Sequence, residues 1–369
     1  MNNYNKTVVG LDVHKETIVM GLLPEWSEKV TETARLENTP NAVENMVKRL
    51  GGRGPIEFVY EAGPCGYEVQ RQMQSLGYSC FIVAPGLIPK KATDRVKTDR
   101  RDAEKLARLW RAGELTEIRV PTMQEEADRD LVRLRESSVA NRLRAQHRLG
   151  KFLLRHGRIY RETKTWGWAH KNWLAVQKFE YEASQKTFEG YMRSLQDCEE
   201  ESRLLDQQVQ DLAESEAYRT KVQYLRALKG INTISAITLL VEAQDLLRFK
   251  NASGFMKFTG LTSWESSSGN RVVRGGISKA GNAHIRRILV ESAWSYSSYK
   301  AGAGSTLAKK RKGCPVEILS LAKKAQERLH RKFYRMRARG KASGIAVTAV
   351  ARELAGFVWF MARHFPKTA

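Results

Sequence analysis

Apolar, β-branched residues form short runs over the first 120 residues, and turn-forming residues separate these runs. Residues 7–22 hold two runs around a polar turn at 14–16, which predicts a β-hairpin. Later runs at 56–60 and 79–84 predict two more strands. Between and after them the spacing becomes helical, which is typical of an α/β layer fold. The predicted helices span residues 40–50, 67–76 and 99–112.

The strand pattern disappears between about residues 124 and 224. Apolar and small residues recur there three and four positions apart, which predicts two long, charge-rich helices with a coiled-coil seam. We expect these helices to pair, chiefly between subunits, so that the protein is a homo-oligomer: a dimer, or a dimer of dimers. The seam positions are Leu131, Leu134, Ser138, Asn141, Ala145 and Phe152, then Leu195, Cys198, Ser202, Leu205, Val209 and Leu212.

Three tryptophans, Trp166, Trp168 and Trp173, lie among basic residues between the two predicted helices. Aromatic side chains chiefly bury area, so the first interpretation is that they pack the turn joining the helices. Stacking against nucleic-acid bases is the second interpretation.

A third region begins at residue 225, where Leu228–Asn232 precede an apolar helix at 234–242. This pattern resembles a helix-hairpin-helix, in which backbone amides hold a phosphate without reading sequence. Asn232 stands where the second glycine of that motif is usual, and asparagine tolerates the left-handed conformation. A plain corner between two packed helices remains the alternative.

The chain carries a net charge of +23 and has a pI of about 9.9. Such an excess attracts polyanions, so nucleic acid is the expected partner. We expect no membrane partner, because the longest apolar stretch, Ile234–Val241, is far shorter than the ~20 residues of a span. The N-terminal residues lack an apolar signal region, which favours the cytoplasm.

The four cysteines are scattered along the chain, at Cys65, Cys80, Cys198 and Cys314. We therefore expect free thiols and no zinc site.

Four acids occupy positions that suit a metal-dependent nuclease. Asp12 and Glu61 close predicted strands, and Asp99 and Asp102 stand three apart at the start of a predicted helix. Such carboxylates can hold two hard cations about 3.5–4 Å apart and neutralise both oxygens in phosphoryl transfer. The alternative is that Asp99 and Asp102 form a helix cap. His14 and Lys15, beside Asp12, are expected to contact phosphate rather than metal.

A second candidate site is the hydroxyl- and glycine-rich segment 264–270, which precedes basic residues and a helix at 284–294. Such a run is most often a plain loop. A serine in a basic, glycine-rich loop is also well placed to attack a phosphodiester.

Residues 300–345 hold eight Lys and six Arg against two Glu, a balance that would repel itself without a counter-anion. We expect nucleic-acid contact here, with 309–312 as a loop-like block and a basic helix at 319–339.

Several motifs together resemble one known family. Residues 9–15 (VGLDVHK), 60–67 (YEAGPCGY) and 97–103 (KTDRRDA) resemble the amino-terminal DEDD domain of the Piv-like insertion-sequence transposases. Residues 260–262, 267–269, 276–282 and 286–294 look like their carboxy-terminal transposase domain, and 340–341 and 349–357 like the tail of one subgroup. Ser263 and Trp264 replace a common Pro-Ser, and Asn232 replaces the hairpin glycine.

The resemblance implies a recombinase guided by a bridge RNA that pairs with donor and target double-stranded DNA. It implies an RNase H/RuvC-like DEDD domain at 1–121, a helical coiled-coil region at 122–224 and a mostly helical transposase domain at 225–369. It also implies that Asp12, Glu61, Asp99 and Asp102 bind Mg²⁺, or Mn²⁺, and that Ser268 forms a phosphoserine link with DNA, with Ser267 as the fallback. Residues expected to contact nucleic acid are Lys15, Arg100, Arg101, Lys229, Arg271, Arg274, Lys279, Arg286, Arg287, Lys309, Lys310, Arg311 and Lys312.

Two other functions fit parts of the same sequence. A hydrolytic RuvC-like nuclease or junction resolvase would need the four acids but not Ser268. A non-catalytic RNA- or DNA-binding protein would need neither. Metal-dependent cleavage would distinguish the non-catalytic protein from both enzymes. A covalent protein–DNA adduct would distinguish the recombinase from the hydrolytic nuclease.

Overall fold

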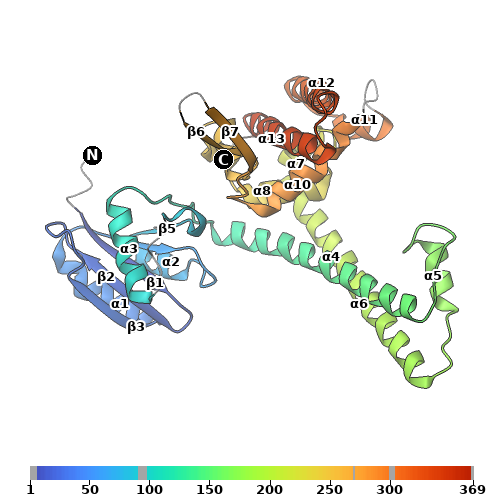
Figure 1. Ribbon diagram of the computed structural model, residues 1–369. Coiled ribbons are helices and arrows are strands. Elements are labelled where there is room, and N and C mark those ends of the chain that lie inside the picture. Colours follow the sequence, from blue (N-terminus) through green and yellow to red (C-terminus); the bar gives the residue numbers. More distant parts are fainter. Residues whose placement is uncertain (1–5, 90–97, 269–270, 299–303, 367–369) are drawn as a thin grey trace. The chain divides into compact units, whose positions relative to one another are not determined.

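The computed structural model of the chain describes residues 6–89, 98–268, 271–298 and 304–366, apart from the side chains of residues 53, 266–268, 271, 272 and 274. The chain divides into two compact units, Met1–Pro121 and Thr122–Ala369. Figure 1 shows a unit built on a β-sheet and a second unit built almost entirely from helices.

The first unit is a five-stranded sheet in the order β3-β2-β1-β4-β5. β1 pairs antiparallel with β2 and parallel with β4; β3 is antiparallel to β2, and β5 is parallel to β4. The strands are β1 (Thr7–Val13), β2 (Thr17–Leu23), β3 (Glu32–Glu37), β4 (Ile56–Glu61) and β5 (Ser79–Val83). The predicted hairpin and the two later strands are therefore confirmed.

Helices cover both faces of this sheet (Figure 1). Because side chains alternate along a strand, Val9 and Leu11 of β1 pack with α1 and α2, whereas Val8 packs with α3 on the opposite face. The helices are α1 (Pro40–Leu50), α2 (Glu68–Ser75) and α3 (Asp99–Arg111), with short 3₁₀ turns at Gly51–Arg53 and Pro85–Leu87.

The sequence did not predict β3, an edge strand with the sequence ETARLE. Its side chains are partly or fully exposed, and three of its six residues are charged. Charges suit an edge strand, which must not pair with another chain. They also remove the apolar alternation by which a strand is recognised.

Two long helices, α4 (Met123–Arg155) and α6 (Glu182–Ala213), form an arm of the second unit, and α5 (Trp168–Ala175) lies near its end (Figure 1). Ala145, Leu149 and Phe152 of α4 form one cluster with Phe188 and Leu195 of α6. The two helices therefore pair with each other within one chain. The buried residues of this seam face a helix of the same chain, and pairing between subunits stays a prediction. Leu134 is 50% exposed and does not belong to the seam.

Trp166 and Trp173 pack against this cluster, so the packing interpretation is confirmed for both. The ring of His170 stacks on Trp173, with centroids 5.6 Å apart. Trp168 is 81% exposed and takes no part in the packing.

The body of the second unit is one apolar core shared by most of its helices. A two-stranded antiparallel hairpin, β6 (Ser263–Ser268) and β7 (Arg271–Ile277), is attached to it. The prediction of a loop at 264–270 was therefore wrong for Trp264–Ser268, because serine and glycine runs hide a strand signal. The helices are α7 (Arg219–Arg226), α8 (Thr233–Ala243), α9 (Ala252–Phe258), α10 (Ala283–Ala293), α11 (Ser305–Arg311), α12 (Val316–Ala338) and α13 (Ser343–Ala362), with 3₁₀ turns at Leu246–Arg248 and Trp294–Ser297.

Helix α13 is long and apolar enough, by composition, to cross a membrane, which the apolar runs of the sequence did not suggest. Twelve of its 20 residues are buried in the protein, and it packs against α9, α10 and α12. This burial is that of a central core helix.

Candidate active site

The register of the sheet brings Asp12 and Glu61 to neighbouring positions. Leu11 of β1 lies opposite Tyr60 of β4, so each acid follows directly on a paired residue of two parallel strands. Val8 and Val59 belong to the cluster on the α3 face, and Asp12 and Glu61 lie an even number of residues further along each strand. Because side chains alternate, both acids lie on the face that α3 covers.

Gly10 lets α3 approach this face closely. A Cβ atom at Gly10 would lie 2.0 Å from the carbonyl oxygen of Ala103 and 2.7 Å from the amide nitrogen of Ala107. Helix α3 therefore runs antiparallel to β1, with Ala103 over Gly10. One turn before Ala103, the start of α3 lies beside Asp12.

A threonine, and neither aspartate, caps the start of helix α3. Thr98 is the N-cap, and its hydroxyl accepts a hydrogen bond from the Arg101 amide. The alternative that Asp99 caps the helix was therefore wrong. Asp99 and Asp102 lie in the first turn of α3, where the helix dipole stabilises negative charge.

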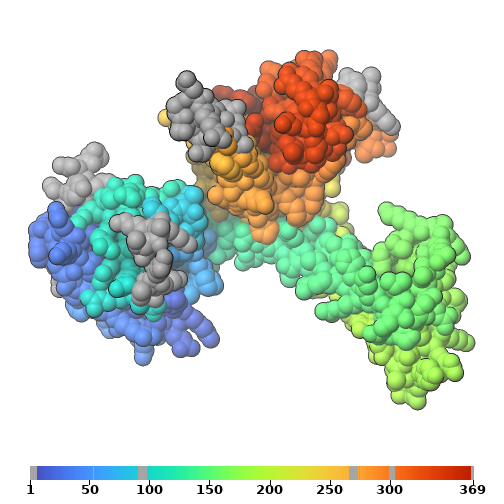
Figure 2. Space-filling model, in the orientation of Figure 1, coloured from blue at the N-terminus to red at the C-terminus, as the bar shows by residue number. Residues whose placement is uncertain are grey.

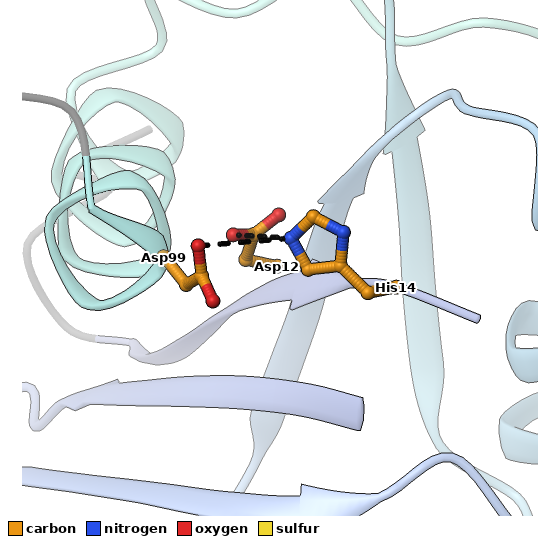
Figure 3. A group of neighbouring side chains, drawn as sticks. All are labelled: Asp12, His14 and Asp99. Atoms are coloured by element: carbon orange, nitrogen blue, oxygen red, sulfur yellow. Dashed lines mark hydrogen bonds and ion pairs between the residues drawn. The ribbon is translucent and has the colours of Figure 1, made fainter. Parts of the chain in front are cut away.

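His14 joins the acids of the two elements (Figure 3). Its Nε2 donates to Oδ2 of Asp12 at 3.2 Å and lies 3.8 Å from Oδ1 of Asp99. One ligand atom from each of these three residues lies within 4.8 Å of the others. The β1–β2 turn that carries His14 is fixed by its amide, which donates to the Thr17 carbonyl, and by Asn38, whose side chain donates to the His14 carbonyl.

The environment of Asp12 disfavours a negative charge. Partial burial raises the pKa of Asp12, and repulsion from Asp99 and Asp102 raises it further, although His14 acts in the opposite direction. Asp12 is thus electrostatically coupled to both Asp99 and Asp102. Clustered carboxylates of this kind are costly unless a cation compensates them.

The donor set fits a divalent metal. Carboxylate oxygens are ligands that suit Mg²⁺ and Mn²⁺. Asp12 and Asp99 would hold such an ion, with Glu61 and Asp102 on the same face of the sheet. Sequence reasoning assigned His14 to phosphate; its place two residues after a strand-end acid was the signal that it lies in the cluster.

The turn between α7 and α8 has the outline of the predicted helix-hairpin-helix. Gly230 adopts a φ of 87°, and a Cβ atom there would lie 2.3 Å from the carbonyl oxygen of Ser292. Asn232 is extended, not left-handed, and its side chain caps α8 by accepting from the Ser235 amide. The Lys229 amino group donates to the Ser298 carbonyl at 2.6 Å.

The basic block at 309–312 ends helix α11 instead of forming a loop, and it divides into two kinds of residue. Lys310 donates to the Ile231 carbonyl at 3.0 Å, and Arg311 donates to the Ala227 carbonyl at 3.1 Å. Burial lowers the pKa of both groups. These two residues hold the α7–α8 turn, whereas Lys309 and Lys312 are exposed.

The start of α10 is also tied into the protein. Arg286 donates to the Thr259 and Lys279 carbonyls, and Arg287 pairs with Glu136 of α4. Asn282 caps α10 and donates to Glu242, a side chain only 1% exposed that Arg133 also binds through two nitrogens. The cations at 286, 287, 310 and 311 thus have partners within the protein, and their contact with nucleic acid stays a prediction.

Ser268 is the last residue of β6 and lies opposite Arg271 at the tip of the hairpin. Its side chain and those of Ser267, Arg271 and Arg274 lie outside the described residues. At the base of the hairpin, the Trp264 ring covers Gly275: a Cβ atom there would lie 1.8 Å from the indole. The other predicted contacts with described side chains are exposed: Lys15, Arg100, which pairs with Glu104, Arg101, Lys279, Lys309 and Lys312.

Comparison with known proteins identifies both units. Residues 9–157 match the profile of a DEDD transposase of the IS110 type, and residues 222–307 match the profile described as "Transposase IS116/IS110/IS902 family". The chain is 36% identical over 368 residues to the putative transposase y4qE of Sinorhizobium fredii, covering 99% of this chain and 91% of that protein.

A second relative, the transposase for insertion sequence element IS1533 of Leptospira borgpetersenii, is 36% identical over 343 residues, or 91% of this chain and 98% of that protein. The transposase for IS1111A of Coxiella burnetii is 21% identical over 300 residues, or 78% and 76% of the two chains. Similarity of this extent, over both units, shows that the chain belongs to the IS110/IS116 family of insertion-sequence transposases.

Proposed function

We propose that this transposase cuts and rejoins DNA with two groups of residues: the carboxylates Asp12, Glu61, Asp99 and Asp102, and the hydroxyl of Ser268. The observation that carries the proposal is the convergence of Asp12, His14 and Asp99 from a strand, a turn and a helix onto one point. The sheet order 3-2-1-4-5, with acids on the two central strands, supports a RuvC-like fold for the first unit.

The carboxylates are proposed to bind Mg²⁺, with Mn²⁺ as a substitute. A bound divalent ion would stabilise the charge that develops on the attacking and leaving oxygens of the phosphodiester. Asp12 and Asp99 contribute oxygens from a strand and a helix, and His14 orients Asp12 through its hydrogen bond. Because Thr98 caps α3, the Asp99 carboxylate is available for this task.

Ser268 is proposed as the nucleophile. Its Oγ loses a proton and bonds to phosphorus, while the bond from phosphorus to one deoxyribose oxygen breaks and that oxygen takes up a proton. Rejoining reverses these steps with a different strand end, so no external energy source is needed. A serine hydroxyl requires activation, and the described residues of β6 supply no histidine. The carboxylate site must therefore meet Ser268 in the active state, within one chain or across two subunits.

A bridge RNA is the proposed guide, and donor and target double-stranded DNA are the proposed substrates. The charge of +23 supports binding of several polyanions at once. Exposed cations on both units, among them Lys15, Lys309 and Lys312, are available to bind phosphates. The reaction would take place in the cytoplasm, on the chromosome.

The test is a reaction with purified protein, co-purified RNA and labelled donor and target DNA. The proposal expects metal-dependent cleavage and a protein–DNA adduct that survives denaturation. Cleavage without an adduct would instead establish a hydrolytic RuvC-like nuclease or resolvase. Binding without metal-dependent cleavage would establish a non-catalytic nucleic-acid-binding protein.

A further inference from the structure

A groove of about 980 Å³ lies between the base of the β6–β7 hairpin and the helices α12 and α13. Figure 2 shows gold surface, from the part of the chain before α11, next to the red surface of the C-terminal helices. Ser263 and Gly276 line it on the hairpin side, and Arg339, Gly344, Thr348 and Arg352 line it on the helical side. None of the functional residues discussed above lies in this groove.

The groove carries uncompensated positive charge. In the part of the chain that the structure describes, the side chains of Arg339 and Arg352 make no hydrogen bond or ion pair. Lys332, a third cation in the lining, is paired with Glu353. Glu265 is the acid of the lining, and it interacts within the protein. Two guanidinium groups are therefore free to bind an anion, and guanidinium matches the geometry of a phosphate.

The first turn of α13 adds to this anion-binding character. Gly344 and Ile345 of that turn line the groove, and the N-cap residue, Ala342, has no side chain that could accept a hydrogen bond from the first amides. Amides at a helix N-terminus bind phosphate through hydrogen bonds and the helix dipole. Met336, Ile345 and Ala349 supply apolar surface for sugars and bases in the same groove.

We infer that this groove holds a single strand of DNA beside the hairpin that carries Ser268. A groove of this volume, at the top of the ~300–1,000 Å³ range of ligand sites, has room for a short piece of one strand. Ser263 and Ser268 are five residues apart on β6, which spans ~17 Å at the usual rise of a strand. Backbone phosphates on Arg339, Arg352 and the α13 amides would thus lead a strand along the hairpin. That the strand is DNA rests on the proposed function, in which Ser268 attacks DNA.

The test measures binding without chemistry. Full-length protein carrying Ser268→Ala, in EDTA, is titrated with labelled oligo(dT) and, separately, oligo(rU) over a range of salt concentrations. Arg339→Gln/Arg352→Gln removes the two free cations. Lys323→Gln/Lys257→Gln is the matched control, because both lysines are exposed helical residues outside the groove. Gly344→Trp fills the groove without a charge change; a Cβ atom at Gly344 meets nothing within 4 Å.

The double substitution Arg339→Gln/Arg352→Gln is expected to weaken oligo(dT) binding at least about tenfold. It should also flatten the salt dependence by about 0.7 for each phosphate that is no longer bound. Gly344→Trp should weaken binding without the same change in slope, and the lysine control should match the parent protein. Parent-like binding by both groove variants would overturn the inference. Loss of oligo(rU) binding with oligo(dT) binding intact would assign the groove to RNA and overturn it too. Because the assay measures binding and no cleavage, its result does not depend on whether Ser268 is the nucleophile.

Discussion

The backbone of Gly10 lies against the carbonyl oxygen of Ala103, so closely that a methyl group at Gly10 would come within 2.0 Å of that oxygen. This contact fixes the distance between β1, which carries Asp12, and α3, which carries Asp99 and Asp102. The carboxylate cluster thus depends on a residue that has no side chain.

Gly10→Ala is expected to push α3 away from the sheet and to abolish metal-dependent cleavage. Overpacking of this kind costs about 1–3 kcal/mol, so urea denaturation should show a less stable but folded protein. Gly52→Ala is the matched control, because a Cβ atom there meets nothing within 4 Å. Full activity in Gly10→Ala would show that the position of α3 does not matter to catalysis.

Asp12→Asn is expected to raise the melting temperature of the metal-free protein at pH 7. The pKa of Asp12 is raised in the folded protein by burial and by Asp99 and Asp102. As pH rises above the ordinary value of 3.8, the unfolded chain loses this proton first, so ionisation of Asp12 costs stability. The advantage of the variant should therefore shrink as the pH is lowered toward the acid range.

The same experiment with Mg²⁺ should reverse the order, because an ion that binds the folded state stabilises it by mass action. Scanning calorimetry with and without the metal measures both effects. Glu16→Gln, an exposed acid of the neighbouring turn, controls for the loss of one charge. A metal-free Asp12→Asn that melts below the parent protein at pH 7 would show that the cluster is not electrostatically strained.

The basic block should separate into binding and structural residues. Lys309→Gln/Lys312→Gln is expected to weaken binding to DNA of any sequence and to flatten its salt dependence by up to ~0.9 for each duplex phosphate that is no longer bound. Lys310→Met/Arg311→Met should chiefly lower the melting temperature, because it leaves the Ala227 and Ile231 carbonyls without these donors. Equal effects of the two pairs on binding and on stability would refute this division.

Oligomer formation should depend on the outer face of the arm and not on its seam. Leu143 and Leu154 of α4 are 46% and 51% exposed, although they are large and apolar. Leu143→Glu/Leu154→Glu is expected to give folded monomers by light scattering combined with circular dichroism. Leu149→Ala, in the buried seam, should lower stability by ~2–5 kcal/mol and leave the subunit count unchanged. An oligomer that survives the double charge substitution would place the subunit contact elsewhere.

Patterns of apolar residues were sufficient to predict the elements that are well buried. Apolar runs predicted β1 and β2, whose residues are mostly buried, and helical spacing predicted α1 at residues 40–50. The same reasoning placed Asp12 and Glu61 at strand ends, where the structure has them. It failed for β3 and β6, whose charged and hydroxyl side chains carry no apolar pattern.

Tertiary contacts were beyond the reach of such patterns. Whether a lysine or arginine meets solvent or a carbonyl depends on residues far away in sequence, as Arg311 and Ala227 show. The pairing of α4 with α6 within one chain also depends on long-range contacts. The apolar spacing of either helix is equally compatible with pairing between two subunits. His14 joined the carboxylate cluster because the β1–β2 turn directs it back over Asp12, a contact that its place two residues after Asp12 suggests but does not establish.

The covalent adduct is the most direct test of the central claim, that Ser268 works together with the carboxylate site. Parent protein, Ser268→Ala, Ser267→Ala and Asp12→Asn are each incubated with guide RNA, Mg²⁺ and end-labelled donor and target DNA. The products are denatured, and labelled DNA is followed on the protein band. We expect an adduct from the parent protein and Ser267→Ala, and none from Ser268→Ala or Asp12→Asn, with RNA binding retained in all four. An adduct and recombined DNA from Ser268→Ala would contradict the account.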